Sequence, residues 1–243
     1  QTLRTLACNN DTAVIYAQAQ AGYHFTSWSD GNTNNPRTII MTQDKTLHAN
    51  FAVSLYNFTV QSEDASEGTV TGNNGSYQYG TELTITATPE EHYHFDHWDI
   101  QFESDEVISV NEAIQIASNL KHGEKTIQSY NIYGYITGNY RSYINSYFVA
   151  SSPNGSDEFV IFKAQQSANV GDLVLVQSQI TNYQGIYETM EGATIQIIAN
   201  PNQNPLLINI AGNTQLTAIF AKEQYQFCYS CINGYGNTDY SGS

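Results

Sequence analysis

Three histidines lie close together in the chain, spaced as His92-x-His94-x-x-His97. On a strand, the first two would lie on the same face, and imidazole is a common ligand for zinc and nickel. A copy of this stretch occurs earlier in the chain, and of the three histidines only His94 has a counterpart there, His24. We therefore expect ordinary exposed histidines and predict no bound metal and no other cofactor.

The three cysteines of the chain are Cys8, Cys228 and Cys231. The last two have the spacing of a redox motif, but no alternation of strands and helices surrounds them, and a zinc site would need two more ligands nearby. In an oxidising compartment, a disulfide between Cys8 and one of the pair is the expectation. No Ser-His-Asp arrangement, nucleophile elbow, phosphate loop or HExxH pattern is present, so we predict no catalytic residues and do not expect an enzyme.

The overall charge excludes two classes of partner. The chain of 243 residues carries 23 acidic and 8 basic side chains, which give a formal net charge of −15. Nucleic acid and anionic membranes both attract clustered cations, so neither is an expected partner. No apolar run approaches the roughly 20 residues that span a bilayer, so membrane insertion is not expected either. Because no signal peptide is visible and the chain opens on Gln1, we expect a processed mature form or a fragment of a longer protein.

The aromatic stretch around Trp28 is repeated, and the repeat organises the chain. Residues Tyr23–Trp28 recur as Tyr93–Trp98, at an offset of 70 residues. Residues Asn35–Phe51 recur as Asn204–Phe220, at an offset of 169. The second copy is therefore split by an insertion of 99 residues, between about Asp99 and Asn200.

The two ends of the chain are complementary. By the same offsets, Gln1 corresponds to Thr71, so the first copy lacks the opening strands that the second copy has before about Gly72. The tail, Tyr225–Ser243, corresponds to that missing piece. One face of the tail could enter a core, because aromatic residues alternate along it: Tyr225, Phe227 and Tyr229.

Alternation of polar and apolar residues predicts the strands of both copies. In the first copy we expect strands at 12–19, 23–28, 37–42 and 46–51, with a tight hairpin at Gln43-Asp44 between the last two. In the second copy the pattern opens with a strand at 56–61. An aromatic triad is expected to fill the core of each copy, composed of Tyr23, Phe25 and Trp28 in the first and Tyr93, Phe95 and Trp98 in the second.

Several motifs of the two copies occur together in a known family. They include Tyr79-Gly80-Thr81, the segment Thr84–Pro89, the pattern Y-x-F-x-x-W-x-D-G-N from Tyr23 and the sequence N-P-R-T-I from Asn35. In these motifs, residues 1–100 and 200–243 resemble the divergent internalin-type B repeat, also called the Listeria–Bacteroides repeat. The resemblance implies a small β-grasp-like module of secreted and surface proteins, with a stalk, adhesive or spacer role and no catalytic residues.

The chain departs from the pattern of that family at three points. The first copy is truncated, the second is split, and Leu206-Leu207 stands where the family usually has a polar pair.

The insertion has a sequence pattern of its own. Apolar residues from Val110 to Leu120 recur at helical spacing, Ser109 and Glu112 form a capping box, and Gly123 is expected to end the helix. Strands are expected at 127–137, 143–151, 158–164, 170–180 and 185–190. One helix and about five strands resemble the OB-like domains attached to Bacteroidetes surface proteins.

Tyrosines of the insertion could form a ligand face, since OB folds bind single strands or sugars on one face of the barrel. Between residues 100 and 199, ten acidic and four basic side chains give a net charge of −6, which argues against nucleic acid. Stacking of aromatic rings on a glycan or a host surface stays open, with the candidate face Tyr133, Tyr135 and Tyr147.

Together these patterns predict a mainly β protein, built from β-grasp-like internalin B-type repeats with an inserted OB-like β-barrel domain that carries one helix. The expected domains are an incomplete repeat at 1–53, a complete repeat made of 54–100 and 200–221, the inserted domain at 101–199 and the tail at 222–243.

The favoured function is that of a non-catalytic extracellular structural or adhesive protein at the cell surface. Its tail would add a strand to the incomplete first copy of another molecule, so that copies join head to tail in a fimbria-like filament or stalk. Cys8 and Cys228 or Cys231 could then lock the joint. The tail could also fold back on its own first copy, although the short linker Ala221–Gln224 favours pairing between molecules. The alternatives are a glycan-binding surface module acting through the insertion, or an accessory region of a larger secreted enzyme.

Overall fold

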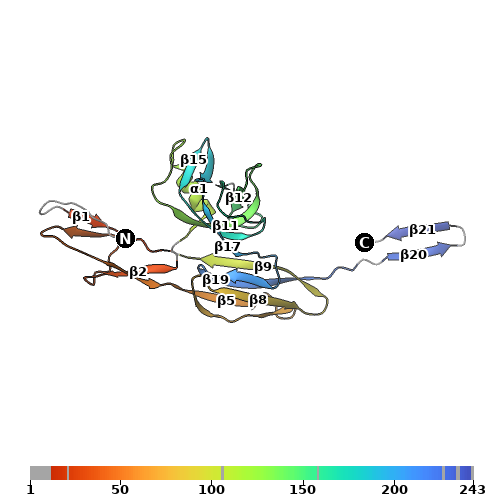
Figure 1. The fold of residues 1–243 in the computed structure, drawn as a ribbon. Helices are drawn as coiled ribbons and strands as arrows, with labels where there is room; N and C mark the ends of the chain where they lie inside the picture. Colours follow the sequence, from red (N-terminus) through yellow and green to blue (C-terminus); the bar gives the residue numbers. More distant parts are fainter. Residues whose placement is uncertain are drawn as a thin grey trace.

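The protein is mainly β, as predicted from its sequence, and contains a single helix in the part of the chain that the structure describes (Figure 1). The structure is a computed structural model that describes residues 12–20, 22–104, 107–157 and 159–225, and the backbone of residues 228–233 and 236–241. Among these residues, no helix is long and apolar enough to cross a membrane.

The first repeat consists of two small sheets. Strand β1 (Thr12–Ile15) pairs with β3 (Arg37–Ile40), and β2 (Tyr23–Trp28) pairs with β4 (Ala49–Val53), both antiparallel. The hairpin predicted around Gln43-Asp44 is therefore wrong. Strands β3 and β4 belong to different sheets, because each pairs with an earlier strand instead of with its neighbour in sequence.

The second repeat has larger sheets. Strand β8 (Glu82–Pro89) lies between β6 (Gly68–Thr71) and β18 (Leu206–Asn209) in a three-stranded sheet. A four-stranded sheet has the order β7 (Gly75–Gln78), β5 (Leu55–Ser62), β19 (Asn213–Lys222) and β9 (Tyr93–Glu103). Strands β18 and β19 follow the insertion in sequence, yet they pair with strands that precede it.

Matching polar contacts occur in the two repeats at the offsets found in the sequence. The indole Nε1 of Trp28 donates to the Asn34 carbonyl oxygen at 2.9 Å, and that of Trp98 donates to the Gln203 carbonyl oxygen at 3.0 Å. A second contact is also duplicated: the Asn35 amide bonds both backbone groups of Ala17, as the Asn204 amide does for Ala87. Residues 34–51 and 203–220 therefore occupy equivalent places in the two repeats.

The insertion begins with β10 (Ile108–Ser109) and α1 (Val110–Ser118). The capping box is confirmed, since the Ser109 hydroxyl accepts from the Glu112 N–H and the Glu112 carboxylate accepts from the Ser109 N–H. The helix ends earlier than predicted, with Asn119 as its C-cap. The Asn119 N–H donates to the Ile116 carbonyl oxygen, and the Asn119 side-chain amide donates to the backbone carbonyl oxygen of Gln115. These two bonds close the last turn before Gly123.

The rest of the insertion is one sheet of eight strands, with β10 on β11. Its main order is β15 (Ile180–Tyr183), β16 (Ile186–Thr189), β13 (Phe159–Ile161), β12 (Tyr147–Ala150), β11 (Tyr130–Asn139), β14 (Leu173–Ser178) and β17 (Thr194–Ala199). The hydrogen-bonded strands among the described residues do not form the predicted closed barrel, because the order ends at β15 on one side and β17 on the other. Only Gln179 separates β14 from β15, so these two strands are joined by the chain and not by a ladder of hydrogen bonds.

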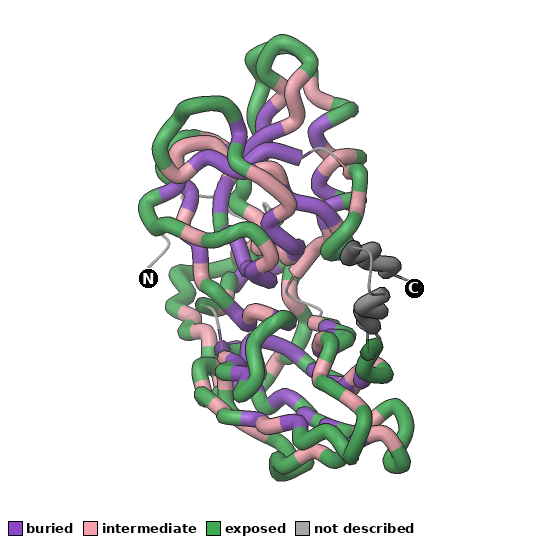
Figure 2. Tube along the Cα trace, turned by 90° about the vertical axis from the view of Figure 1, so that its right-hand side faces the viewer, coloured by how far each residue is buried: buried purple, intermediate pink, exposed green. Residues whose placement is uncertain are grey.

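The insertion and the second repeat share a core. Tyr135, Leu173 and Ile198 of the insertion are buried in one cluster with Ile100 and Leu206 of the second repeat. A separate cluster lies between α1 and the inner face of the insertion sheet. Buried segments accordingly occur inside the insertion and along its junction with the second repeat (Figure 2).

This shared core explains the departure from the family pattern at Leu206. The first repeat has Asp30 and Arg37 where the second has Ile100 and Leu206, and Leu206 is 0% exposed. In the first repeat the two side chains form an ion pair at 2.7 Å, with the Asp30 side chain 36% exposed and that of Arg37 11% exposed. In the second repeat the insertion covers the same place, so apolar side chains replace the charged ones.

The described tail forms a hairpin. Strand β20 (Cys228–Asn233) pairs antiparallel with β21 (Gly236–Ser241), and neither strand belongs to a sheet with any other described strand (Figure 1). The structure therefore does not place the tail on the first repeat of the same molecule.

His92 lies in a turn of the second repeat where its backbone adopts the left-handed conformation that favours glycine. His92 has a φ of 72°, and the equivalent residue of the first repeat is Gly22, with a φ of 80°. Because the left-handed region costs a non-glycine residue about 1–2 kcal/mol, replacing His92 with glycine should raise the free energy of unfolding by about 1 kcal/mol. His94→Gly, a change within strand β9, is the matched control and should lower it instead. Urea unfolding followed by circular dichroism tests both, and a loss of stability in His92→Gly would contradict the prediction.

Candidate functional site

The first repeat presents an unpaired sheet edge. Strand β4 pairs with β2 on one side and with no described strand on the other. Its counterpart in the second repeat, β19, pairs with β9 along its whole length, and residues 214–218, equivalent to 45–49, lie parallel to β5 on the other side. The unpaired N–H and C=O groups of such an edge can accept a further strand.

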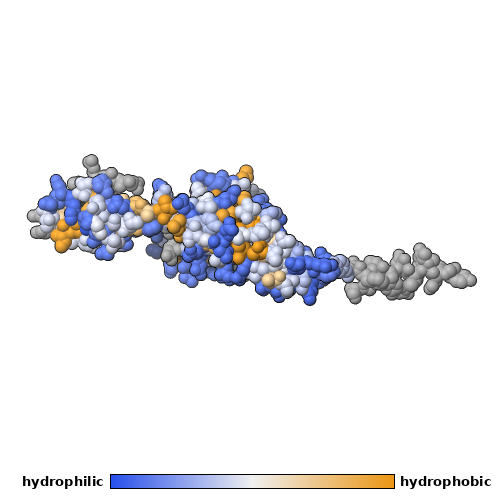
Figure 3. All heavy atoms as spheres, turned by 90° about the horizontal axis from the view of Figure 1, so that it is seen from below, coloured by the Kyte–Doolittle hydropathy of each residue, from blue (hydrophilic) through white to orange (hydrophobic). Residues whose placement is uncertain are grey.

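Apolar side chains are exposed beside this edge. Phe51 of β4 is 41% exposed, whereas its counterpart Phe220 is 5% exposed because the backbone of β6 at Gly68 packs directly against its ring. No described strand takes the place of β6 in the first repeat. Several hydrophobic side chains of the first repeat are exposed: Val14, Tyr16, Tyr23, Ile40, Phe51 and Val53. Figure 3 shows hydrophobic residues at the surface of the first repeat, on its left.

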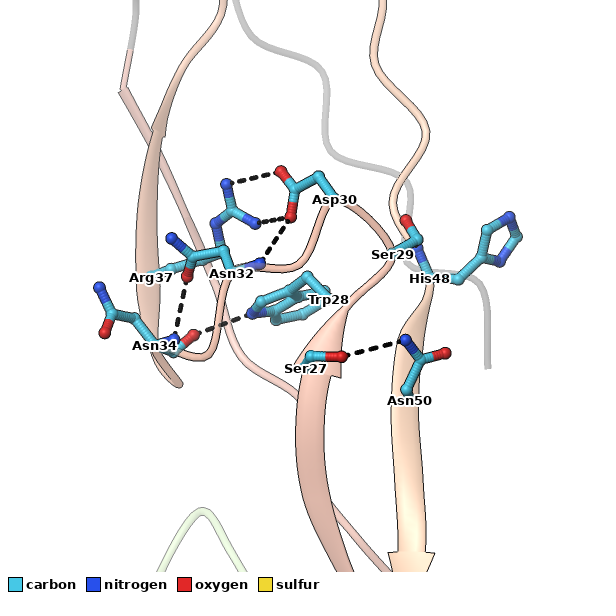
Figure 4. A network of polar contacts seen from close by, with 9 residues as sticks. All are labelled: Ser27, Trp28, Ser29, Asp30, Asn32, Asn34, Arg37, His48 and Asn50. Atoms are coloured by element: carbon cyan, nitrogen blue, oxygen red, sulfur yellow. Dashed lines mark hydrogen bonds and ion pairs between the residues drawn. The ribbon is translucent and has the colours of Figure 1, made fainter.

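A network of polar contacts holds the turn that follows β2 in the first repeat (Figure 4). The Arg37 guanidinium donates to both carboxylate oxygens of Asp30, at 2.7 and 3.0 Å. These bonds, together with the Asn32 N–H, hold the pKa of Asp30 below its usual range. The Asn34 N–H in turn donates to the Asn32 side-chain oxygen, which fixes the carbonyl that receives the Trp28 indole. The network shapes a turn and leaves no carboxylate free for chemistry, since Asp30 is fully engaged by Arg37.

Two segments of the chain, residues 3–54 and 58–113, each match the family model described as the divergent InlB B-repeat domain. Residues 3–113 therefore contain two divergent InlB B-repeat domains. The B-repeat family points to a non-catalytic surface module and to an extracellular or cell-surface location. The matches leave most of the insertion, and the strands β18 and β19, outside the family model. No curated protein and no solved structure is similar enough to match the chain.

The predicted aromatic triads of the two B-repeats differ in burial. Trp28 and Trp98 are buried, and Phe25 and Phe95 are half-buried, with each phenylalanine ring 5.4 Å from its tryptophan. Tyr93 packs partly against the shared core. Tyr23, in contrast, is 45% exposed and does not fill a core, because the first B-repeat has only two-stranded sheets around it in the described structure.

The predicted tail and disulfide residues lie largely outside the described side chains. Tyr225 is 74% exposed, and its hydroxyl donates to Glu223. Tyr229, Cys228 and Cys231 lie in β20, of which only the backbone is described, and Phe227 and Cys8 are outside the described residues. In an extended strand, residues three apart are about 10 Å apart, so Cys228 and Cys231 cannot bond to each other while β20 is formed.

The histidines of the second B-repeat do not converge. His97 pairs with Asp96 at 2.7 Å and His92 lies near Glu91 at 3.6 Å, each within its own stretch of chain. Within the described residues, no group of three or more histidine, cysteine, aspartate or glutamate side chains is arranged to hold a metal ion.

The predicted ligand face does not exist as an exposed surface. Tyr135 is 6% and Tyr147 is 5% exposed, so neither ring presents a face on the open surface, and Tyr133 is half-buried. The three residues also point into different places. Tyr147 lies in the core of the insertion, while Tyr135 and Tyr133 lie at its junction with the second B-repeat.

Two hollows of the surface were not predicted. One, of about 330 Å³, lies between β9 and β11 and is lined in part by Phe102, Tyr133 and Ser151. The other, of about 470 Å³, is open and is lined by Ser142, Tyr143, Ile144, Asn145, Lys163 and Ala164. Each hollow joins residues from separate stretches of the chain, and no spacing in the sequence indicates them.

Proposed function

We propose that this chain is a non-catalytic structural protein of the cell surface, whose copies join head to tail by strand addition. The tail of one molecule adds a strand beside residues 45–49 of the next, at the start of β4. One observation carries the proposal: residues 45–49, which lead into β4, have no described strand beside them on the side away from β2, whereas the equivalent residues 214–218 lie beside β5, and β5 corresponds in sequence to the tail.

The second repeat supplies the register of the added strand. There, β19 runs parallel to β5, with Thr214 opposite Phe58 and Ala218 opposite Ser62. Transferred by the offset of 169, Phe227 of the donor lies opposite Lys45 of the acceptor, and Cys231 lies opposite Ala49. Residues 45–48 form no strand in the single chain. We expect them to become strand once the donor provides hydrogen-bond partners.

The tail must open before it can be donated. Its strands β20 and β21 correspond roughly to β5 and β6, which belong to different sheets of the second repeat. In the free molecule the two tail segments pair with each other, which satisfies their backbone groups until an acceptor is available. Isolated two-stranded hairpins are marginally stable in water, so the cost of opening is small.

A disulfide is not needed for this joint. Cys8 corresponds to Gln78, which lies opposite Leu55 in the second repeat. The residue equivalent to Leu55 in the tail is Gln224, so Cys8 faces Gln224, and Cys228 is four residues, or about 13 Å, further along the donated strand. That separation exceeds the reach of a disulfide. The joint therefore rests on strand pairing and on the burial of Phe51.

The experiment compares the full chain with a chain ending at Lys222, both kept reduced and studied by sedimentation velocity over a range of concentrations. The full chain should form a series of end-to-end oligomers, and the shortened chain should remain monomeric. Phe51→Asp should weaken association at least about tenfold, which corresponds to about 1.4 kcal/mol. Ile144→Asp, at a residue 84% exposed on the insertion, is the matched control and should leave association unchanged.

A full chain that stays monomeric at all concentrations would contradict the proposal, as would oligomers that persist without residues 223–243. Oligomers that form only when the reductant is left out would show that a disulfide and not strand addition forms the joint.

A further inference from the structure

The crevice between the second repeat and the insertion has the features of a binding site. It lies between β9 and β11, where the two parts share their core, and its volume of about 330 Å³ is at the small end of the range for ligand pockets. Because the shared core fixes both walls, the crevice is formed without any ligand. Junctions of this kind are frequent places for ligand sites.

One wall of the crevice is the free edge of β9. Strand β9 is the outer strand of its sheet, with β19 on one side only. The Trp98 N–H donates away from β19, to the Pro201 carbonyl oxygen, and the Ile100 carbonyl accepts from the Tyr135 hydroxyl at 3.4 Å. Backbone groups of alternate residues face the same edge, so the N–H and C=O of Phe102 also face this side. No described residue bonds them there.

The other wall supplies hydroxyl groups. Ser151 lines the crevice, and its Oγ is the one buried side-chain oxygen or nitrogen without a hydrogen-bond partner among the described residues. Its backbone is held in place, because the Ser151 N–H donates to the Asp157 carboxylate at 3.3 Å. The hydroxyl can rotate between staggered positions, and a position that meets a ligand acceptor removes the cost of an unsatisfied buried group.

Aromatic rings complete the crevice. The rings of Phe102 and Tyr133 lie 5.3 Å apart and are tilted by 52°. The Tyr133 hydroxyl has no hydrogen-bond partner among the described residues. Burial raises its pKa, and the charges of Glu112 and Glu103 raise it further, so the hydroxyl keeps its proton and can donate. Burial also raises the pKa of Tyr135 to about 12, so the bond from Tyr135 to the Ile100 carbonyl persists at any physiological pH.

We propose that this crevice binds one neutral sugar residue, such as the end of an uncharged glycan. A sugar has hydroxyls that both donate and accept, which suits the mixture of a backbone edge, Ser151 and Tyr133, and its apolar face suits the two rings. An anionic ligand is disfavoured, because no lysine or arginine lines the crevice and Glu103 lies beside it. This inference is independent of the proposed assembly, since it concerns neither the tail nor β4.

The open hollow beside Tyr143 gives the experiment its control site. That hollow contains Lys163, whose Nζ lies 5.9 Å from the centre of the Tyr143 ring and 3.4 Å from Glu191. It therefore favours acidic sugars, whereas the crevice favours neutral ones. Tyr143→Phe is the matched control for Tyr133→Phe, because each removes one hydroxyl and keeps the ring.

The experiment uses the full chain on an array of neutral and acidic oligosaccharides, followed by titration of the strongest neutral binder in saturation-transfer NMR. Ser151→Ala and Tyr133→Phe should each weaken binding about three- to tenfold, the usual effect of losing one hydrogen bond. Tyr143→Phe should leave it unchanged. Ser151→Ala should also be at least as stable as the parent protein in urea unfolding, because it removes a buried hydroxyl that has no partner, so lost binding cannot be attributed to misfolding.

Three results would overturn the inference. They are an array without any neutral binder, binding of acidic sugars alone, and neutral binding that Tyr143→Phe weakens while Ser151→Ala and Tyr133→Phe do not.

Discussion

Replacing Leu206 with arginine, the residue at the equivalent position of the first repeat, is expected to destabilise the second repeat and the insertion by about 3–5 kcal/mol. Leu206 is fully buried in the core that the two parts share. Arginine there would place a charge without a counter-ion among apolar side chains, and an unpaired buried charge carries a cost of this size. Urea unfolding followed by circular dichroism measures the loss.

Two further variants separate charge from volume at this position. Leu206→Met keeps the volume and should lose less than about 1.5 kcal/mol. Combining Leu206→Arg with Ile100→Asp recreates the Asp30–Arg37 pair of the first repeat, and it should recover part of the lost stability without reaching that of the parent. An arginine variant as stable as the methionine variant would show that the insertion does not cover this position in solution.

Replacing Trp98 with alanine is expected to lower the stability of the second repeat and the insertion together, by about 3–5 kcal/mol. Trp98 is 1% exposed and belongs to the shared core, so its loss leaves a cavity that both parts line. Trp28→Ala removes the equivalent side chain from a repeat of two-stranded sheets. It should destabilise the first repeat alone.

The chain contains two tryptophans, so each variant retains the fluorescent reporter of the other repeat. In Trp98→Ala, the fluorescence of Trp28 should keep its unfolding midpoint while the circular dichroism transition moves to lower urea. In Trp28→Ala, the fluorescence of Trp98 should keep its midpoint. Equal shifts in both signals for both variants would show that the two repeats unfold as one unit.

The repeat itself made much of the fold predictable. Once Trp28 and Trp98 are aligned, the position of Phe220 opposite Phe95 follows from that of Phe51 opposite Phe25, although the insertion separates Phe220 from Phe95 in sequence. The capping box of Ser109 and Glu112 was equally predictable from the sequence, because it depends only on two residues that are three positions apart.

Burial between parts of the chain was not predictable in the same way. Alternation along β11 shows that Ile132 and Tyr133 face opposite sides, but it does not show which side is covered. In the structure both sides are covered, one by α1 and one by the second repeat, so Tyr135 is buried where the sequence indicated an outer face. The crevice has the same origin, since Phe102 and Ser151 meet only when the two parts pack together.

The parallel arrangement of β5 and β19 determines how the molecule resists stretching. The chain enters the second repeat at Leu55, where β5 begins, and leaves it after Lys222, where β19 ends. A pull along the chain therefore slides these neighbouring strands lengthwise past each other, and all the hydrogen bonds between them carry the load at once instead of opening one by one. The insertion lies between β9 and β18, away from the path of the force, so the proposed sugar site can keep its shape while the chain is under tension.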